Sequence, residues 1–163
     1  MGQPSRFAPF AIVLILAVIL QVALIAADHQ QTPIRTAKEF TKDYFYLDPD
    51  MQDYLCESLA EEGTVVDNYL YAKRQEADQR GLPVTYLQKM FTTLHLTIEE
   101  QDEATATVHV SGTTRVAVNP VFMLVGKWFR IGDNYPVNAT LELVKEKEGW
   151  RVCGAPFDLE PVE

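Results

Sequence analysis

A period-two alternation runs through residues 105–118, TATVHVSGTTRVAV, and constrains the fold more than any other feature. The even-numbered positions carry most of the apolar side chains: Ala106, Val108, Val110, Val116 and Val118. The odd-numbered positions are mostly polar: Thr105, Thr107, His109, Ser111, Thr113 and Arg115. Successive side chains of a strand point to opposite faces of a sheet. The pattern therefore predicts a long antiparallel strand with one buried face.

The segments on both sides of this strand supply its partners. A strand is predicted within residues 86–100, where Leu94, Leu96 and Ile98 alternate with polar residues before an acidic turn at 101–103. Residues 137–143 predict a further strand, and a tight turn at 147–149 leads into a last strand at 150–153. The second half of the chain is therefore expected to be an antiparallel meander.

Helical spacing dominates the residues before the first strand. Thr36 is the expected N-cap of one helix, with Glu39 completing a capping box. Asp48 and Pro49 begin a second helix that Gly63 ends, and Thr64 opens a third. Helices followed by hairpin-linked strands predict an α+β fold. We expect an N-terminal transmembrane helix, then about three helices packed on a curved antiparallel sheet of four to five strands.

An apolar segment precedes these helices. Residues 7–27, FAPFAIVLILAVILQVALIAA, contain no charge, and about 20 such residues cross a bilayer. A transmembrane helix is predicted there, with residues 1–6 cytoplasmic, a linker at 28–35 and an extracytoplasmic domain at 36–163. This placement corresponds to a single-pass protein of a bacterial inner membrane with a periplasmic domain. A signal peptide cleaved after Ala27 is the rival interpretation. Gln21 is either a tolerated polar residue or a contact to another membrane helix.

Composition limits the partners. The formal net charge is −9, and no acidic residue precedes Asp28. An acidic domain repels phosphate backbones, so no nucleic acid partner is expected. The expected partners are the lipid bilayer, through residues 7–27, and membrane-protein subunits.

The final hairpin carries a resemblance to a known family. A helical first half, then ATATVHVSGTTRV and LELVKEKEGWRVCG, resembles the nuclear transport factor-like superfamily, in particular small exported bacterial domains. The resemblance covers roughly residues 36–157 and implies a cone-shaped, cystatin-like α+β fold. It implies fold more than function, because members of the superfamily include isomerases, dehydratases, ligand binders and scaffolds.

Candidate chemistry is sparse. Enzymes of that superfamily often use an Asp–His pair inside the cone, and His95 and His109 are the histidines that strands could bring together. No aspartate motif accompanies them, and no metal-ligand, phosphate-loop or nucleophile motif occurs. We therefore expect no catalytic residue, cofactor or metal. Cys56 and Cys153 are expected to form a disulfide in an oxidising compartment, with two buried thiols as the alternative.

The alternation fails in residues 119–133, NPVFMLVGKWFRIGD. A membrane or partner contact is predicted there, through the large apolar side chains Val121, Phe122, Leu124, Val125, Trp128 and Phe129. The alternative is a central strand covered on both faces.

These observations favour a non-catalytic, membrane-anchored extracytoplasmic accessory or assembly subunit of an inner-membrane complex. The first alternative is a small-molecule binding domain that holds an apolar ligand in the cone, which requires a pocket of several hundred Å³ lined by Tyr and Phe. The second is an isomerase or dehydratase, which requires His95 or His109 to point into that cavity with a carboxylate partner.

Overall fold

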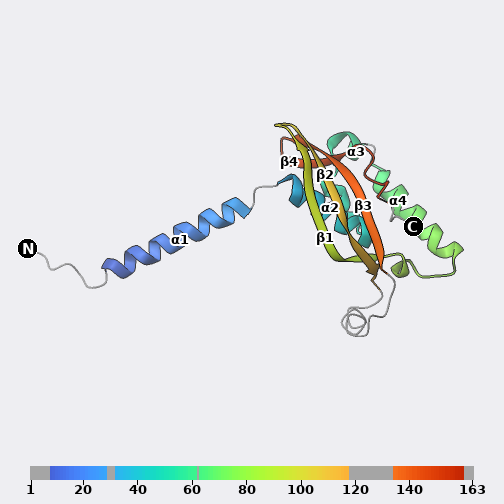
Figure 1. Cartoon of the computed structure of the whole chain (residues 1–163), viewed down its shortest axis with the longest axis horizontal. Coiled ribbons are helices and arrows are strands. Elements are labelled where there is room, and N and C mark those ends of the chain that lie inside the picture. The colour runs from blue at the N-terminus through green and yellow to red at the C-terminus, as the bar shows by residue number, and fades with distance from the viewer. Residues whose placement is uncertain (1–7, 29–31, 62, 118–133, 160–163) are drawn as a thin grey trace, which may run out of the picture. The chain divides into compact units, whose positions relative to one another are not determined.

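A computed structural model describes residues 8–28, 32–61, 63–117 and 134–159 of the chain. The chain divides into two units, Met1–Gln31 and Thr32–Glu163. The first unit contains one helix, α1 (Ala8–Asp28) (Figure 1). The second unit contains all other helices and strands that the structure describes, and it matches the predicted α+β class.

The prediction of a transmembrane helix at residues 7–27 is wrong. In the described part of the chain, no helix is long and apolar enough to cross a membrane. A helix does form there, α1, which has 21 residues.

The sheet of the second unit has four antiparallel strands in the order β1-β2-β3-β4. The strands are β1 (Lys89–Gln101), β2 (Thr105–Val116), β3 (Tyr135–Glu146) and β4 (Gly149–Cys153). The predicted meander, its acidic turn and its final hairpin are therefore confirmed. Beyond β4, Leu55 forms an isolated parallel bridge with Val152, and the Cys56 N–H donates to the Val152 carbonyl at 2.9 Å.

In the described part of the second unit, five helical segments precede the sheet. They are α2 (Pro33–Tyr46), the 3-10 helix η1 (Pro49–Tyr54), α3 (Glu57–Glu61), α4 (Val65–Gln79) and the 3-10 turn η2 (Val84–Tyr86). Figure 1 shows α2 behind the sheet, so this helix covers one face and leaves the nearer face in view.

Two helix boundaries differ from the prediction. The N-cap of α2 is Thr32 rather than Thr36, because the Thr32 hydroxyl accepts from the Arg35 N–H at 3.3 Å and Pro33 opens the helix. Thr36 is buried instead, and its hydroxyl donates to the Trp150 carbonyl at 3.2 Å. The single helix predicted between Pro49 and Gly63 is two short helices, since the chain between η1 and α3 is extended where it meets β4.

The core lies between α2 and one face of the sheet. From the helix it takes Ala37, Phe40, Tyr44 and Phe45, all buried. From the strands it takes Ala106, Val108, Val110, Val137, Leu141, Leu143, Trp150 and Val152. The predicted even-numbered apolar face of β2 is therefore the covered face up to Val110.

At Gly112 the backbones of β1 and β2 lie very close together. A Cβ at this position would collide with the Thr93 carbonyl, next to an irregularity of β1 between Phe91 and Thr93.

Candidate functional site

The face of the sheet opposite α2 carries polar side chains in cross-strand rows, and we call it the open face. Its rows are Glu100–Thr107–Glu142, Thr97–His109–Thr140 and His95–Ser111–Asn138. Each row is fixed by the antiparallel register of β1, β2 and β3, because residues paired across strands share one face. The outer members of every row are exposed, and the β2 members are half-buried. The open face is therefore a polar surface carried by three hydrogen-bonded strands.

A local irregularity adds one more acid to this surface. The register of β1 shifts between Ile98 and Glu100, and the extra residue, Glu99, places a carboxylate oxygen 3.7 Å from His109 Nδ1. A bulge redirects a side chain in this way because two residues of one strand then oppose one residue of its neighbour. The end of the open face near the β1–β2 turn therefore carries Glu99, Glu100 and Glu142.

The two candidate histidines do come together on adjacent strands, as the sequence predicts. His95 pairs with Ser111 and His109 pairs with Thr97, so the two histidines are diagonal neighbours. They lie on the open face, whereas Val108 and Val110 point into the core. Among the described residues there is no group of three or more His, Cys, Asp or Glu that could hold a metal ion. Both histidines therefore lie on the face of the sheet opposite α2.

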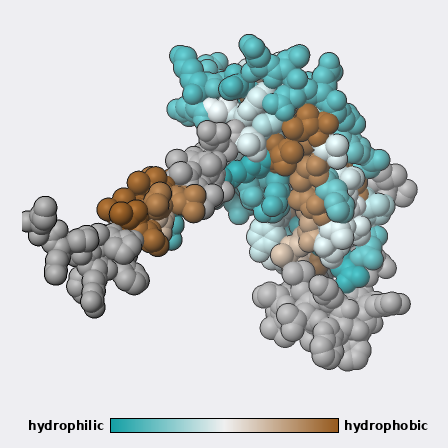
Figure 2. Space-filling model, turned by 60° about the vertical axis from the view of Figure 1, so that its left-hand side comes forward, coloured by the Kyte–Doolittle hydropathy of each residue, from teal (hydrophilic) through white to brown (hydrophobic). Residues whose placement is uncertain are grey.

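The open edge of the sheet is the second surface feature. No described strand pairs with the outer side of β1. Leu94, Leu96 and Ile98 of β1 are half-buried against the core, and Met90 is 37% exposed. Figure 1 places β1 at the left of the sheet, and Figure 2, which turns that side forward, shows a hydrophobic strip between hydrophilic surfaces.

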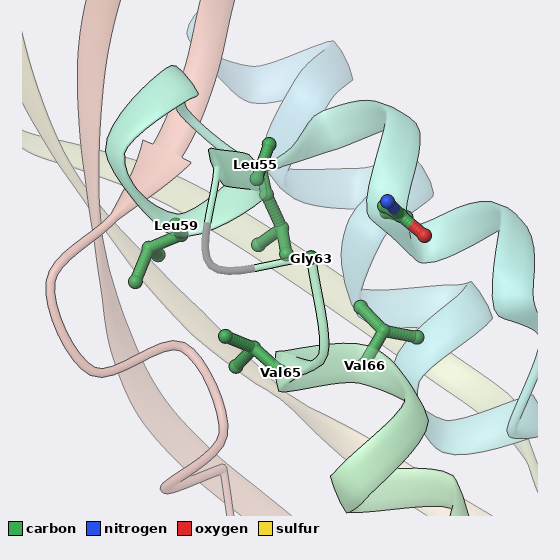
Figure 3. A pocket seen from close by; sticks show the side chains of 7 residues that line it. Leu55, Leu59, Gly63, Val65 and Val66 are labelled. Atoms are coloured by element: carbon green, nitrogen blue, oxygen red, sulfur yellow. The ribbon is translucent and has the colours of Figure 1, made fainter.

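A small hollow lies between η1, α3 and α4. Figure 3 shows Leu55, Leu59, Gly63, Val65 and Val66 around it. It leaves essentially no room for a water-sized molecule, and its other lining residues are Gln52 and Ala60. Sites for small molecules usually measure roughly 300–1,000 Å³. This hollow is smaller than that range and has no Tyr or Phe lining, so it does not match the pocket that the apolar-ligand alternative requires.

The predicted disulfide is confirmed. Cys56 and Cys153 are bonded, with 5.5 Å between their Cα atoms and a sequence separation of 97. Cys56 is buried at the β4 edge, next to the bridge between Leu55 and Val152. The Arg151 guanidinium also donates to the Asp53 carbonyl. Together these contacts hold the segment between η1 and α3 against the sheet.

An acidic cluster lies where α2 meets η1. Burial raises the pKa of the Asp43 carboxyl, and the negative charges of Asp48 and Glu39 raise it further. Burial also raises the pKa of the Tyr54 hydroxyl, with Asp43 as the next cause. Both shifts have a structural cause, because these groups sit beside the packed core among like charges.

The remaining predicted contact residues give no further site. Gln21 lies in α1 with its side chain exposed. The residues predicted in 119–133 lie outside the described part of the chain: Val121, Phe122, Leu124, Val125, Trp128 and Phe129. The open edge of β1 was missed in the sequence. Its signal was present as uncharged alternation at residues 93–98, TLHLTI, but which strand forms an edge depends on the sheet order.

Comparison with known proteins identifies no relative. No protein-family model, curated protein or solved structure matches the chain. The resemblance to the nuclear transport factor-like superfamily therefore stays a prediction.

Proposed function

We propose that this protein is a non-catalytic, extracytoplasmic accessory or assembly subunit that binds a partner protein through the open face of its sheet. The observation that carries the proposal is the open face itself: an array of hydroxyl, amide, imidazole and carboxylate groups that no described helix covers. The core on the other side of the same strands keeps this surface rigid.

A protein partner fits this surface better than a small molecule does. Protein interfaces bury about 800 Å² on each side and need no cavity. Small-molecule sites are concave and mostly apolar. The open face is polar and pleated, and the small hollow between η1, α3 and α4 lies elsewhere. The geometry therefore favours contact with another protein surface.

The charge of the open face defines the partner's chemistry. Glu99, Glu100 and Glu142 are exposed at one end of it, and the chain as a whole carries a net charge of −9. We expect a partner with a basic patch, whose association is accelerated by this field and weakened by salt. Hydroxyl groups such as those of Thr97 and Thr140 supply additional hydrogen bonds.

The disulfide supports placement outside the cytoplasm. Disulfides persist in oxidising compartments and are rare where thiols are kept reduced. The bond between Cys56 and Cys153 joins segments 97 residues apart, and both segments belong to the packed domain. An accessory domain outside the cytoplasm is therefore consistent with its covalent structure.

Site-specific photo-cross-linking in the native cell tests the proposal. A photoreactive residue replaces Thr140 on the open face, and a matched control replaces Tyr71, which is 60% exposed on α4. We expect a discrete adduct from position 140, none from position 71, and loss of the adduct at high ionic strength. Equal labelling from both positions, or no adduct from position 140, would contradict the proposal.

A further inference from the structure

We infer that the outer edge of β1 pairs antiparallel with the same edge of a second copy of this chain. The inference rests on the proposed function, because such pairing joins two open faces into one larger binding surface. A strand with one free side leaves every second residue's N–H and C=O directed away from its only neighbour. Among the described residues, β1 is the long strand in this position: it spans Lys89–Gln101 and pairs with β2 alone.

The middle of β1 lacks the features that protect natural sheet edges. Edges are usually shielded by proline, inward-pointing charges, bulges or very short strands. The two irregularities of β1 lie at Phe91/Thr93 and Ile98/Glu100, one toward each end. Between them, residues 93–98 form a regular stretch, TLHLTI, with no charge and no proline. This stretch is therefore ready to accept another strand.

The same stretch is complementary to itself. Two antiparallel strands related by a two-fold axis perpendicular to the sheet keep the same faces on the same sides. With the axis at His95, Leu94 lies opposite Leu96 of the second copy, and Thr93 lies opposite its Thr97. With the axis at Leu96, Leu94 lies opposite Ile98 of the second copy. Within residues 93–97 of the first register and 94–98 of the second, apolar residues oppose apolar residues and polar residues oppose polar ones.

Charge favours the antiparallel orientation. Lys89 begins β1, whereas Glu99 and Glu100 lie near its end and Asp102 and Glu103 follow in the turn. Antiparallel pairing places the acidic end of each copy beside the Lys89 end of the other. It also places the two acidic ends far from each other, at opposite ends of the paired β1 strands. A parallel arrangement would instead bring the acidic ends together, which like-charge repulsion disfavours.

Pairing of this kind has a direct structural consequence. Both α2 helices remain on one side, and the two open faces become one continuous polar surface with twice the strands. A partner protein with a two-fold or repeated basic surface would then be held at two places at once, which raises its effective affinity.

Oligomeric state, measured on the full chain by light scattering and sedimentation over a range of concentrations, tests the inference. The edge variant is His95→Glu with Thr97→Glu, which places acid against acid in either register. The control variant is Asn138→Glu with Thr140→Glu, which adds the same charge on exposed positions of β3. We expect a reversible dimer for the unchanged chain and the control, and at least a tenfold weaker dimer for the edge variant. Thermal unfolding confirms that each variant folds, and His95→Gln with Thr97→Ser should dimerise like the unchanged chain.

Several outcomes overturn the inference. They are a monomeric unchanged chain, equal dimerisation of edge and control variants, and an edge occupied by an extended segment of a different protein. The proposed function fails separately, since its test is the adduct from position 140. A monomer that still forms that adduct would reject the pairing and keep the function, and a dimer without the adduct would do the reverse.

Discussion

The two faces of the sheet are built by the same strands and differ in what they can do. On β2, Val108 and Val110 have no exposed surface, whereas the residue between them, His109, keeps about a third of its side chain accessible. On β3, Leu141 is 1% exposed and its neighbour Thr140 is exposed. The alternation of the backbone therefore separates two surfaces that lie one residue apart in sequence.

The difference shows how structure and function are divided in this domain. The covered face is held by burial of aliphatic and aromatic side chains under α2, and each change there removes packing. The open face contributes little to that packing, so its side chains are free to serve recognition. Substitutions that act on one face and leave the other intact test whether the two faces are separate in this way.

Removing the disulfide should produce the largest effect. The double variant Cys56→Ala with Cys153→Ala releases a loop of nearly one hundred residues, since the two cysteines are 97 apart. We expect a loss of about 4 kcal/mol in the free energy of unfolding. Amides of β4 should also exchange faster, because the segment between η1 and α3 is no longer tied to that edge. Chemical denaturation and hydrogen exchange measure the two effects.

The neighbouring residue Ser58 supplies the control for this experiment. Its hydroxyl lies 3.3 Å from the Cys56 sulfur, so Ser58→Ala changes the same local environment and keeps the bond. Its effect should stay within about 0.5 kcal/mol. A double cysteine variant as stable as the unchanged protein would show that packing alone holds the segment between η1 and α3 against the sheet.

A matched pair of substitutions on β3 tests the two faces directly. Leu141→Ala removes a fully buried side chain and should lower the free energy of unfolding by about 3 kcal/mol. Thr140→Ala, one residue away on the open face, should change it by no more than about 0.5 kcal/mol. For binding we expect no loss from the buried substitution: a folded Leu141→Ala variant that carries the photoreactive residue at position 140 should still form the partner adduct. Similar losses of stability from both variants would mean that the Thr140 side chain is also packed against other residues of the domain.

The sequence predicted the sheet well because alternation reports directly on faces. Residues 105–118 and 137–143 show which side chains are buried, and the structure confirms this at Val108, Val110, Leu141 and Leu143. The disulfide was predictable too, from an even cysteine count. Such features are local in sequence, or follow from composition, so they do not depend on unknown contacts.

Features that depend on tertiary contacts were harder to predict. The helix expected between Pro49 and Gly63 breaks because Leu55 pairs with Val152, nearly one hundred residues away. The N-cap is Thr32 and not the predicted Thr36, whose hydroxyl donates instead to the Trp150 carbonyl. The face taken by the histidines and the open edge of β1 required the position of α2 and the strand order. Periodicity identifies a buried face, but not which elements cover it or leave an edge free.

The smallest expected effect comes from a charged residue of α2, the helix that covers one face of the sheet. Asp43 lies part-buried beside the core, where burial and the charges of Asp48 and Glu39 raise its pKa above 3.8. A raised pKa means that the folded state binds the proton more tightly than the unfolded state. The ionised carboxylate therefore opposes folding above that pKa, and this penalty disappears as the pH falls through it. Asp43→Asn should accordingly raise the melting temperature slightly at neutral pH and leave it unchanged near pH 3.

The exposed turn residue Glu103 provides the matched control, because Glu103→Gln removes one negative charge without touching the covering layer. If only net charge mattered, both variants would raise the melting temperature equally at neutral pH. We expect a rise for Asp43→Asn alone, since part-buried charges lose hydration and exposed ones keep it. A melting curve followed by circular dichroism at several pH values separates the two. Equal rises would show that α2 tolerates a charge at Asp43 as readily as the exposed turn does at Glu103. The two faces of the sheet would then differ in apolar packing alone.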